Sequence, residues 1–256
     1  MAQGRSHAER VALLLAAPGV KKTNPPRPAI AWPLHFPEPA DLQALYAVCD
    51  GVETDTGVRA FGRGELADVT QWLVLEKGLS WPSDLVVVGE RRDVVVVLDL
   101  DVGGERAGGG VLEVGTDDLG AFERIATDVV GYLCERARVP DSMAPPPETR
   151  ARRAAEARDR EALEQALALP MYPGSARTVA PLAFALGTLH ADADDRARAL
   201  AAFRTSVDAR VATVGRGGRE AERVAAWTAA EHACRSRGRA ELAATCASAA
   251  AKREGA

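Results

Sequence analysis

The sequence predicts an α+β protein: an antiparallel-rich sheet with flanking helices in the first half, followed by an all-α domain of helical hairpins. Two valine-rich runs at residues 86–88 and 94–98 favour strands, because β-branched side chains suit a strand better than a helix. A proline-rich segment at residues 139–150 predicts a stiff linker, and beyond it Ala, Arg and Leu recur without a strand pattern. We therefore expect an α+β domain over residues 1–138 and a helical domain over residues 151–256.

The segments that precede the valine runs predict a helix, a loop and a second helix. Residues 5–22 could pass for a secretion signal, but Glu9 abuts the apolar run and lysines follow it, which favours an amphipathic helix ending near Pro18. Residues 24–39 contain too many prolines for a helix and predict an extended, ordered loop. Gly51 ends the next predicted helix, whose apolar stripe comprises Leu42, Leu45, Tyr46 and Cys49.

Two further segments of the first half show helical spacing, and two short segments predict strands. The strands are expected within residues 57–64 and over residues 110–115. Residues 65–78 repeat the helical pattern, with Gly78 as the C-terminal signal. Residues 117–138 predict a helix that closes the first domain, with apolar residues at helical spacing, namely Leu119, Phe122, Ile125, Val129 and Leu133.

The two valine runs predict a hairpin that is covered on both faces. A strand with one face in water alternates polar and apolar residues, and these runs do not alternate. The four charged residues between them, at 90–93, have the right length for a hairpin loop and are expected in water. We expect helices of the second half, or another copy of the chain, to cover the second face of the sheet.

The second half predicts about five helices packed as antiparallel hairpins and separated by Gly, Pro or Asp. The first is expected over residues 150–169, and the others start near residues 179, 193, 220 and 240.

One spacing in these helices is typical of a repeat. Four residues occur at the offsets of a tetratricopeptide repeat: Leu186, Gly187, Ala199 and Phe203. In that repeat, small residues allow the helices to approach closely and the aromatic residue fills the gap between them. The segment therefore resembles one or two degenerate repeats, although Ala183 and His190 stand where that family usually has Trp and Tyr. A chance match in an alanine-rich segment is the alternative.

The sequence gives little support for catalysis or metal binding. Asp99, Asp101 and Glu105 resemble the start of a calcium loop, but Gly103 occupies the place of the third ligand, which favours a strand end with solvated carboxylates. The glycine clusters match no phosphate-binding motif, and no histidine shares a local motif with a nucleophile. The four cysteines are scattered along the sequence, so we expect them to be small, buried residues of a protein in a reducing compartment. They are Cys49, Cys134, Cys234 and Cys246. We therefore expect a protein that is not an enzyme and has no cofactor and no metal.

Charge is distributed unevenly along the chain. Residues 1–140 hold 14 Lys and Arg against 21 Asp and Glu, whereas residues 141–256 hold 18 against 15. An acidic first half would steer a basic partner, and the net charge of −4 argues against nucleic acid as a partner. Because no apolar run reaches the roughly 20 residues of a membrane span, we expect a cytoplasmic protein with no membrane partner.

The first half resembles the SUKH superfamily, α+β proteins that include fungal cell-wall regulators and many bacterial immunity proteins. The resemblance covers residues 30–138 and rests on PADLQALYAVCDGV, GVRAFGRGEL, LVVVGERRDVVVVLDLD and GVLEVGTDDLGAFERIATDVVGYL. In the order given, these four segments resemble the family's helix that ends in Asn-Gly or Asp-Gly, its short strand, its Ile-Gly hairpin, and its last strand with the closing helix. The resemblance implies a non-enzymatic binding module, which in bacterial members often occludes a cognate toxin, commonly a basic nuclease.

The leading hypothesis is therefore a protein-binding, immunity-like protein that blocks a basic toxin. The expected contact residues are charged groups near the hairpin, namely Arg59, Arg63, Glu90, Arg91, Arg92 and Asp93. The competing hypothesis is a scaffold or regulatory adaptor that recruits its partner through the helical domain. A third is a cation-dependent enzyme that uses Asp99 and Asp101. A homodimer is compatible with all three.

Overall fold

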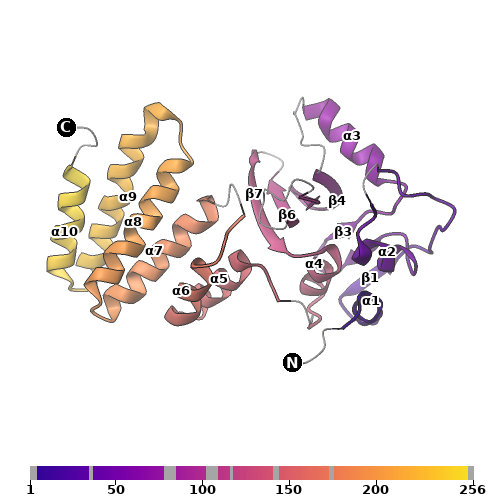
Figure 1. Ribbon diagram of the computed structural model, residues 1–256, viewed down its shortest axis with the longest axis horizontal. Coiled ribbons are helices and arrows are strands. Elements are labelled where there is room, and N and C mark those ends of the chain that lie inside the picture. The colour runs from indigo at the N-terminus through magenta and orange to yellow at the C-terminus, as the bar shows by residue number, and fades with distance from the viewer. Residues whose placement is uncertain are drawn as a thin grey trace. The chain divides into compact units, whose positions relative to one another are not determined.

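The computed structural model describes residues 5–34, 37–77, 85–101, 109–115, 118–140, 144–172 and 176–252. The chain divides into two compact units, of which unit 1, Met1–Pro146, contains the sheet and unit 2, Pro147–Ala256, is helical (Figure 1). The division falls within the segment predicted as a linker, and the last four residues of that segment already belong to the first helix of unit 2.

Unit 1 contains a seven-stranded antiparallel sheet in which strands adjacent in the sequence are adjacent in space. The strands are β1 (Val20–Thr23), β2 (Val52–Thr54), β3 (Arg59–Ala60), β4 (Leu85–Arg91), β5 (Val94–Asp99), β6 (Gly110–Gly115) and β7 (Asp118–Ala126). The strands predicted at the positions of β3 to β6 are confirmed. β1 and β2 were not predicted, because both are short and rich in polar residues, and pairing with their neighbours decides their conformation.

Four helices accompany the sheet: α1 (His7–Leu15), α2 (Ala40–Tyr46), α3 (Leu66–Lys77) and α4 (Val129–Arg136). Helix α1 ends before Pro18, as predicted, and begins with a reciprocal capping box between Ser6 and Glu9. The predicted apolar stripe is buried, but α2 ends at Tyr46 and not at Gly51, so Cys49 lies beyond the helix. Gly78, predicted as the end of α3, lies outside the described residues.

The valine runs lie in the core of unit 1, and the prediction that both faces of the hairpin are covered is confirmed. That helices of the second half or another copy of the chain cover the second face stays a prediction. Val95 and Val97 point to one face of β5 and Val96 to the other, and all three are buried. The runs are therefore apolar without alternation because neither face of these strands meets water. Helix α4 contacts β6 and β7, and helix α3 contacts β4.

The hairpin loop between β4 and β5 is shorter than predicted. Arg91 is paired with Val94, so the strands extend to these residues and leave only Arg92 and Asp93 in the loop. Arg92 adopts a φ of 52°, in the left-handed region that a tight turn needs at this point. The charged loop is exposed, as expected.

The prediction of one helix over residues 117–138 was wrong in its first part. Strand β7 pairs with β6 along this stretch, with Phe122 opposite Val114 and Ala126 opposite Val111. Helix α4 starts only after Asp128, whose carboxylate accepts a hydrogen bond of 2.6 Å from the Gly131 N–H. Helical spacing is a weak constraint, and here the hydrogen bonds offered by β6 override it.

A buried group of charged side chains joins α1, α2 and α4. Arg10, 1% exposed, donates two hydrogen bonds of 2.7 and 2.8 Å to the carboxylate of Asp128. Asp41 accepts hydrogen bonds of 2.8 and 3.3 Å from the N–H groups of Val129 and Val130 in the first turn of α4. Burial, and then the negative charge of Asp128, raise the pKa of the Asp41 carboxyl. The start of α4 is therefore fixed by charged groups in the interior.

Unit 2 consists of three helical hairpins. Its helices are α5 (Pro147–Glu156), α6 (Arg160–Leu167), α7 (Ala176–Asp192), α8 (Arg196–Ala212), α9 (Arg219–Arg235) and α10 (Ala240–Ala251), with a short 3₁₀ turn, η1 (Arg216–Gly218). The described residues thus hold six α-helices where about five were predicted, because residues 150–169 form parts of two helices. Arg158 and Asp159 separate those two, and Asp159 caps α6 by accepting a hydrogen bond from the Ala162 N–H.

The same turn closes each of the three hairpins. Each turn has one residue in the left-handed region, with φ of 55° at Arg158, 61° at Asp194 and 71° at Gly238. The next residue donates its N–H to a carbonyl five residues back, which satisfies a free group at the end of the preceding helix. Those three hydrogen bonds run from Asp159 to Ala154, from Asp195 to His190 and from Arg239 to Cys234, at 2.8, 2.9 and 3.0 Å.

Close packing between α7 and α8 depends on Gly187. A Cβ added at Gly187 would lie 2.6 Å from the ring of Phe203, which is fully buried. The ring of Phe203 also packs against Phe184, with ring centroids 5.4 Å apart. The small residue and the aromatic residue singled out in the sequence are therefore direct neighbours across the hairpin.

Candidate functional site

Four of the six predicted contact residues lie on one exposed area of unit 1, which we call the hairpin surface: Arg59, Glu90, Arg92 and Asp93. Arg59 lies opposite Glu90 in the pairing of β3 with β4 and donates a hydrogen bond of 3.2 Å to its carboxylate. Arg59 also pairs with Glu65. Exposed ion pairs of this kind contribute little to the free energy of folding, so breaking them to bind a partner would cost little free energy.

Arg63, the fifth predicted residue, fixes the proline-rich loop. Its guanidinium donates hydrogen bonds of 2.6 Å to Glu38 and 3.0 Å to the Ile30 carbonyl, and it lies over the ring of Tyr46. The backbone N–H of Arg63 donates to the carboxylate of Asp50. These contacts hold the described parts of the loop at Ile30 and Glu38, and they leave Arg63 only 15% exposed.

Arg91, the sixth predicted residue, belongs to a partly buried charge cluster. Glu113 on β6 accepts hydrogen bonds from Arg91 at 2.9 Å, from Arg136 at 2.5 Å and from the hydroxyl of Tyr132 at 2.8 Å. The cluster joins β4 and β6 to α4. Arg91 therefore has a structural role, which local sequence patterns do not indicate because its partners come from distant segments.

We expect the cluster around Glu113 to make stability depend on pH. Burial raises the pKa of Glu113, but Arg136, Arg91 and Tyr132 outweigh burial and hold that pKa below its ordinary value of about 4.3. The stabilisation is therefore complete above about pH 5 and is lost as the pH falls through the depressed pKa.

The variant Glu113→Gln tests this dependence, because it removes the charge and keeps the side-chain size. At pH 7 it should lower the free energy of unfolding of unit 1 by about 1–3 kcal/mol, the range for hydrogen bonds to charged groups. Urea unfolding at pH 7, 5 and 3.5 should show the difference from the wild type shrinking toward low pH. An equal difference at all three values would contradict the assignment.

Asp99 and Asp101 are the residues of the third hypothesis, a cation-dependent enzyme. Asp99 is buried at the end of β5 and accepts a hydrogen bond of 2.8 Å from the Asp101 N–H, while Glu105 lies outside the described residues. No group of three potential metal ligands occurs within the described residues. The four cysteines are free and buried, as predicted, and burial raises the pKa of Cys246 to about 12.

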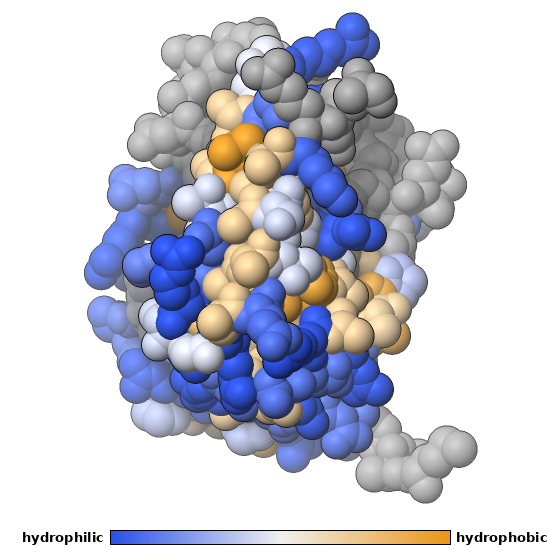
Figure 2. All heavy atoms as spheres, turned by 90° about the vertical axis from the view of Figure 1, so that its left-hand side faces the viewer, coloured by the Kyte–Doolittle hydropathy of each residue, from blue (hydrophilic) through white to orange (hydrophobic). Residues whose placement is uncertain are grey.

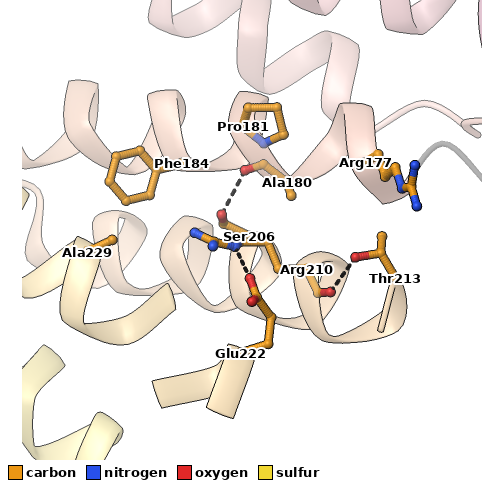
Figure 3. Close-up of a pocket in the computed structure, with 9 residues that line it drawn as sticks. All are labelled: Arg177, Ala180, Pro181, Phe184, Ser206, Arg210, Thr213, Glu222 and Ala229. Carbon is orange, nitrogen blue, oxygen red and sulfur yellow. Dashed lines mark hydrogen bonds and ion pairs between the residues drawn. The ribbon is translucent and has the colours of Figure 1, made fainter. Parts of the chain in front are cut away.

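Unit 2 contains a groove of about 480 Å³ between α7, α8 and α9 (Figure 3). The lining residues are Arg177, Ala180, Pro181, Phe184, Ser206, Arg210, Thr213, Glu222 and Ala229. The outermost lining residues are seven apart on α7 and on α9, and also from Ser206 on α8 to Thr213 just after its end. This spacing places them on one face over two turns, or about 10 Å. The volume is within the range of ligand-binding sites, and a wall of apolar side chains with few polar groups is typical of them.

The polar groups of this groove are held in place by hydrogen bonds. Arg210 donates from Nε to the carboxylate of Glu222 at 2.5 Å, which connects α8 to α9. The buried hydroxyl of Ser206, one turn earlier on α8, donates to the Ala180 carbonyl on α7 at 2.7 Å. Both contacts are drawn in Figure 3, where the Arg210 side chain lies between Phe184 and Glu222. The three helices are therefore fixed around a preformed opening.

Sequence reasoning missed this groove. Its one unusual feature in the sequence is Pro181, an exposed proline inside α7 that lacks the N–H of a normal helical residue. The seven-residue spacings could be recognised only after the three helices and their pairing were known. The groove was therefore not predictable from local patterns.

A second surface feature of unit 2 is a band of apolar side chains bordered by charged ones, seen over the last helices in Figure 2. The exposed apolar residues of α10 are alanines, including Ala244 and Ala251. Alanine offers little area for burial, and we assign this band no binding role.

Comparison with known proteins finds no matching family, no matching curated protein and no matching solved structure. The resemblances to the SUKH superfamily and to tetratricopeptide repeats therefore remain predictions. No helix within the described ranges is long and apolar enough to cross a membrane. Fold and site together define an α+β sheet unit followed by a unit of paired helices that carries a ligand-sized groove.

Proposed function

We propose that the chain is a non-enzymatic protein-binding protein that recruits a partner through the groove of unit 2. The observation that supports this function is the groove itself, which is preformed by contacts between three helices and has an apolar wall on α7. Paired helices with an apolar groove suit the binding of a short segment of another protein. This is the adaptor hypothesis considered for the sequence.

Filling the groove tests this function. Ala229 is partly exposed on α9 and lines the groove, so Ala229→Phe should occupy the space without disturbing the core. We expect the variant to lose the partner that the wild-type chain captures from an extract of the native cells. The partner should then be purified and its affinity measured, with a loss of at least about tenfold for the variant, equivalent to 1.4 kcal/mol.

The matched control is Ala244→Phe, which adds the same side chain on the exposed face of α10, outside the residues that line the groove. The control should bind as the wild type does. Equal binding by Ala229→Phe and the wild type would contradict a role of the groove, provided that circular dichroism shows both variants folded.

The immunity-like function is a second candidate, and the hairpin surface favours it. Arg59, Glu90, Arg92 and Asp93 place exposed charges of both signs at one site, on the unit whose sequence is acidic. Such a surface suits occlusion of a basic partner by complementary charge. The double variant Arg59→Glu with Glu90→Arg keeps an ion pair between these positions but exchanges the two charges. If the immunity-like function is correct, this variant should no longer capture the partner, whereas Ala229→Phe should still capture it.

A further inference from the structure

Resting on the proposed function, we propose that the segment bound in the groove presents an acidic side chain to Arg210 and a bulky apolar side chain to the wall formed by Pro181 and Phe184. The occupant is an internal, extended segment of a partner protein. Three observations lead to this chemistry: the apolar wall, the orientation of Arg210 and the balance of charge.

The wall of the groove can hold one large apolar side chain. Ala180, Pro181 and Phe184 lie along one face of α7, and Ala229 lies on α9. The Phe184 ring is fixed by its contact with the buried ring of Phe203, so this wall is rigid. Figure 3 shows Pro181 and Phe184 on the same helix above the opening. A rigid apolar wall favours a partner side chain of similar character, because binding then removes apolar surface from water.

Arg210 is held in an orientation suited to a carboxylate. Glu222 engages only its Nε, and Arg210 has no other side-chain hydrogen bond or ion pair within the described residues. The side chain remains 40% exposed, so its two terminal nitrogens are accessible. A guanidinium already fixed at one edge loses little freedom when it binds a carboxylate, and the resulting hydrogen bonds are charge-assisted.

The charge around the groove selects an acidic partner over a basic one. Two arginines, Arg177 and Arg210, line it against one acidic residue, Glu222. Unit 2 as a whole carries 18 Lys and Arg against 14 Asp and Glu, which adds a weaker long-range attraction for an acidic segment.

The length of the groove sets the size of the recognised segment. The lining residues span about two helical turns, or about 10 Å. An extended chain advances about 3.3 Å per residue, so the groove covers about three residues. The acidic and apolar side chains should therefore lie within about three positions of each other.

A displayed library of random heptapeptides, flanked on both sides by fixed linkers, tests the proposal directly. The linkers exclude recognition of a chain end. The library is selected on the full-length wild-type chain after depletion on Ala229→Phe. We expect enriched sequences to combine Asp or Glu with Leu, Ile, Met, Phe or Trp within three positions.

The enriched peptides are then synthesised with blocked ends and their Kd values measured. Arg210→Gln, which can still donate a hydrogen bond to Glu222, should weaken binding by about 10- to 100-fold, the range for losing a hydrogen bond to a charged group. Arg204→Gln removes the same charge from an exposed position of α8 that does not line the groove, and it should change the Kd by less than twofold. Replacing the acidic residue of the peptide by its amide should reproduce the loss seen with Arg210→Gln.

The possible failures are distinguishable. Enriched peptides without an acidic residue, or equal effects of Arg210→Gln and Arg204→Gln, overturn this inference and leave the proposed function standing. If no peptide is enriched over the filled variant, both the inference and the groove function fail. Melting temperatures within about 2 °C of the wild type show that either arginine variant reports on binding and not on unfolding.

Discussion

Replacing Phe203 by Ala should lower the free energy of unfolding of unit 2 by about 3–5 kcal/mol, the range for removing a buried aromatic side chain. The ring is fully buried and fills the space between α7 and α8 that Gly187 leaves open. Its loss would create a cavity and would also free Phe184, one wall of the groove. Urea unfolding gives the magnitude, and hydrogen exchange should show faster exchange in α7 and α8 than in unit 1.

The contact between Gly187 and Phe203 allows a sharper test by a double-mutant cycle. Gly187→Ala alone should cost about 1–3 kcal/mol through overpacking, although Ala has the higher helix propensity. In a Phe203→Leu background the same substitution should cost less, because the shorter side chain makes room for the new methyl group. Equal costs in both backgrounds would contradict the close contact.

Replacing Arg10 by Met should have the largest effect in unit 1, a loss of about 3–5 kcal/mol. Met fills most of the space but leaves the carboxylate of Asp128 without its buried cation. Asp41, whose pKa is raised by burial and by Asp128, lies beside it. Two carboxylates near the start of α4 would then lack a compensating positive charge, and the packing of α1 on α4 would weaken.

The cause of this loss can be separated from simple packing. Asp128→Asn in the Arg10→Met background removes the unpaired charge and keeps an N-cap for α4, so it should restore about half of the lost stability. Arg5→Met, at an exposed position, removes a hydrogen bond to the Pro140 carbonyl and should cost less than 1 kcal/mol. If Asp128→Asn destabilises the Arg10→Met variant further, an unpaired charge is not the cause.

The two proposed functions use different surfaces, one on each unit. In unit 1, Arg63 and Arg91 fix a loop and a helix, whereas Arg59, Glu90, Arg92 and Asp93 of the hairpin surface are exposed. In unit 2, helices of the second and third hairpins form a groove in which the guanidinium of Arg210 is oriented by Glu222. The capture experiments compare these two surfaces within the same intact chain.

Features that depend on local pattern follow directly from the order of the amino acids. The valine runs have no polar face, so they had to form strands buried on both sides. The stripe of Leu42 and Leu45 dictated which side of α2 is buried, and the proline-rich segment marked where the units divide. The spacing of Gly187 and Phe203 anticipated a direct contact between paired helices.

Features that depend on a distant partner become visible only when the whole chain is folded. Residues 118–126 have helical spacing but form β7, because β6 offers backbone hydrogen bonds that the isolated segment lacks. Arg91 was indistinguishable from a surface charge until Glu113 and Arg136 were placed beside it. The groove requires three helices at once, so no single segment encodes it. Local periodicity determines which face of a helix or strand is apolar. Which other segment packs against that face depends on interactions that form only when the whole chain is folded.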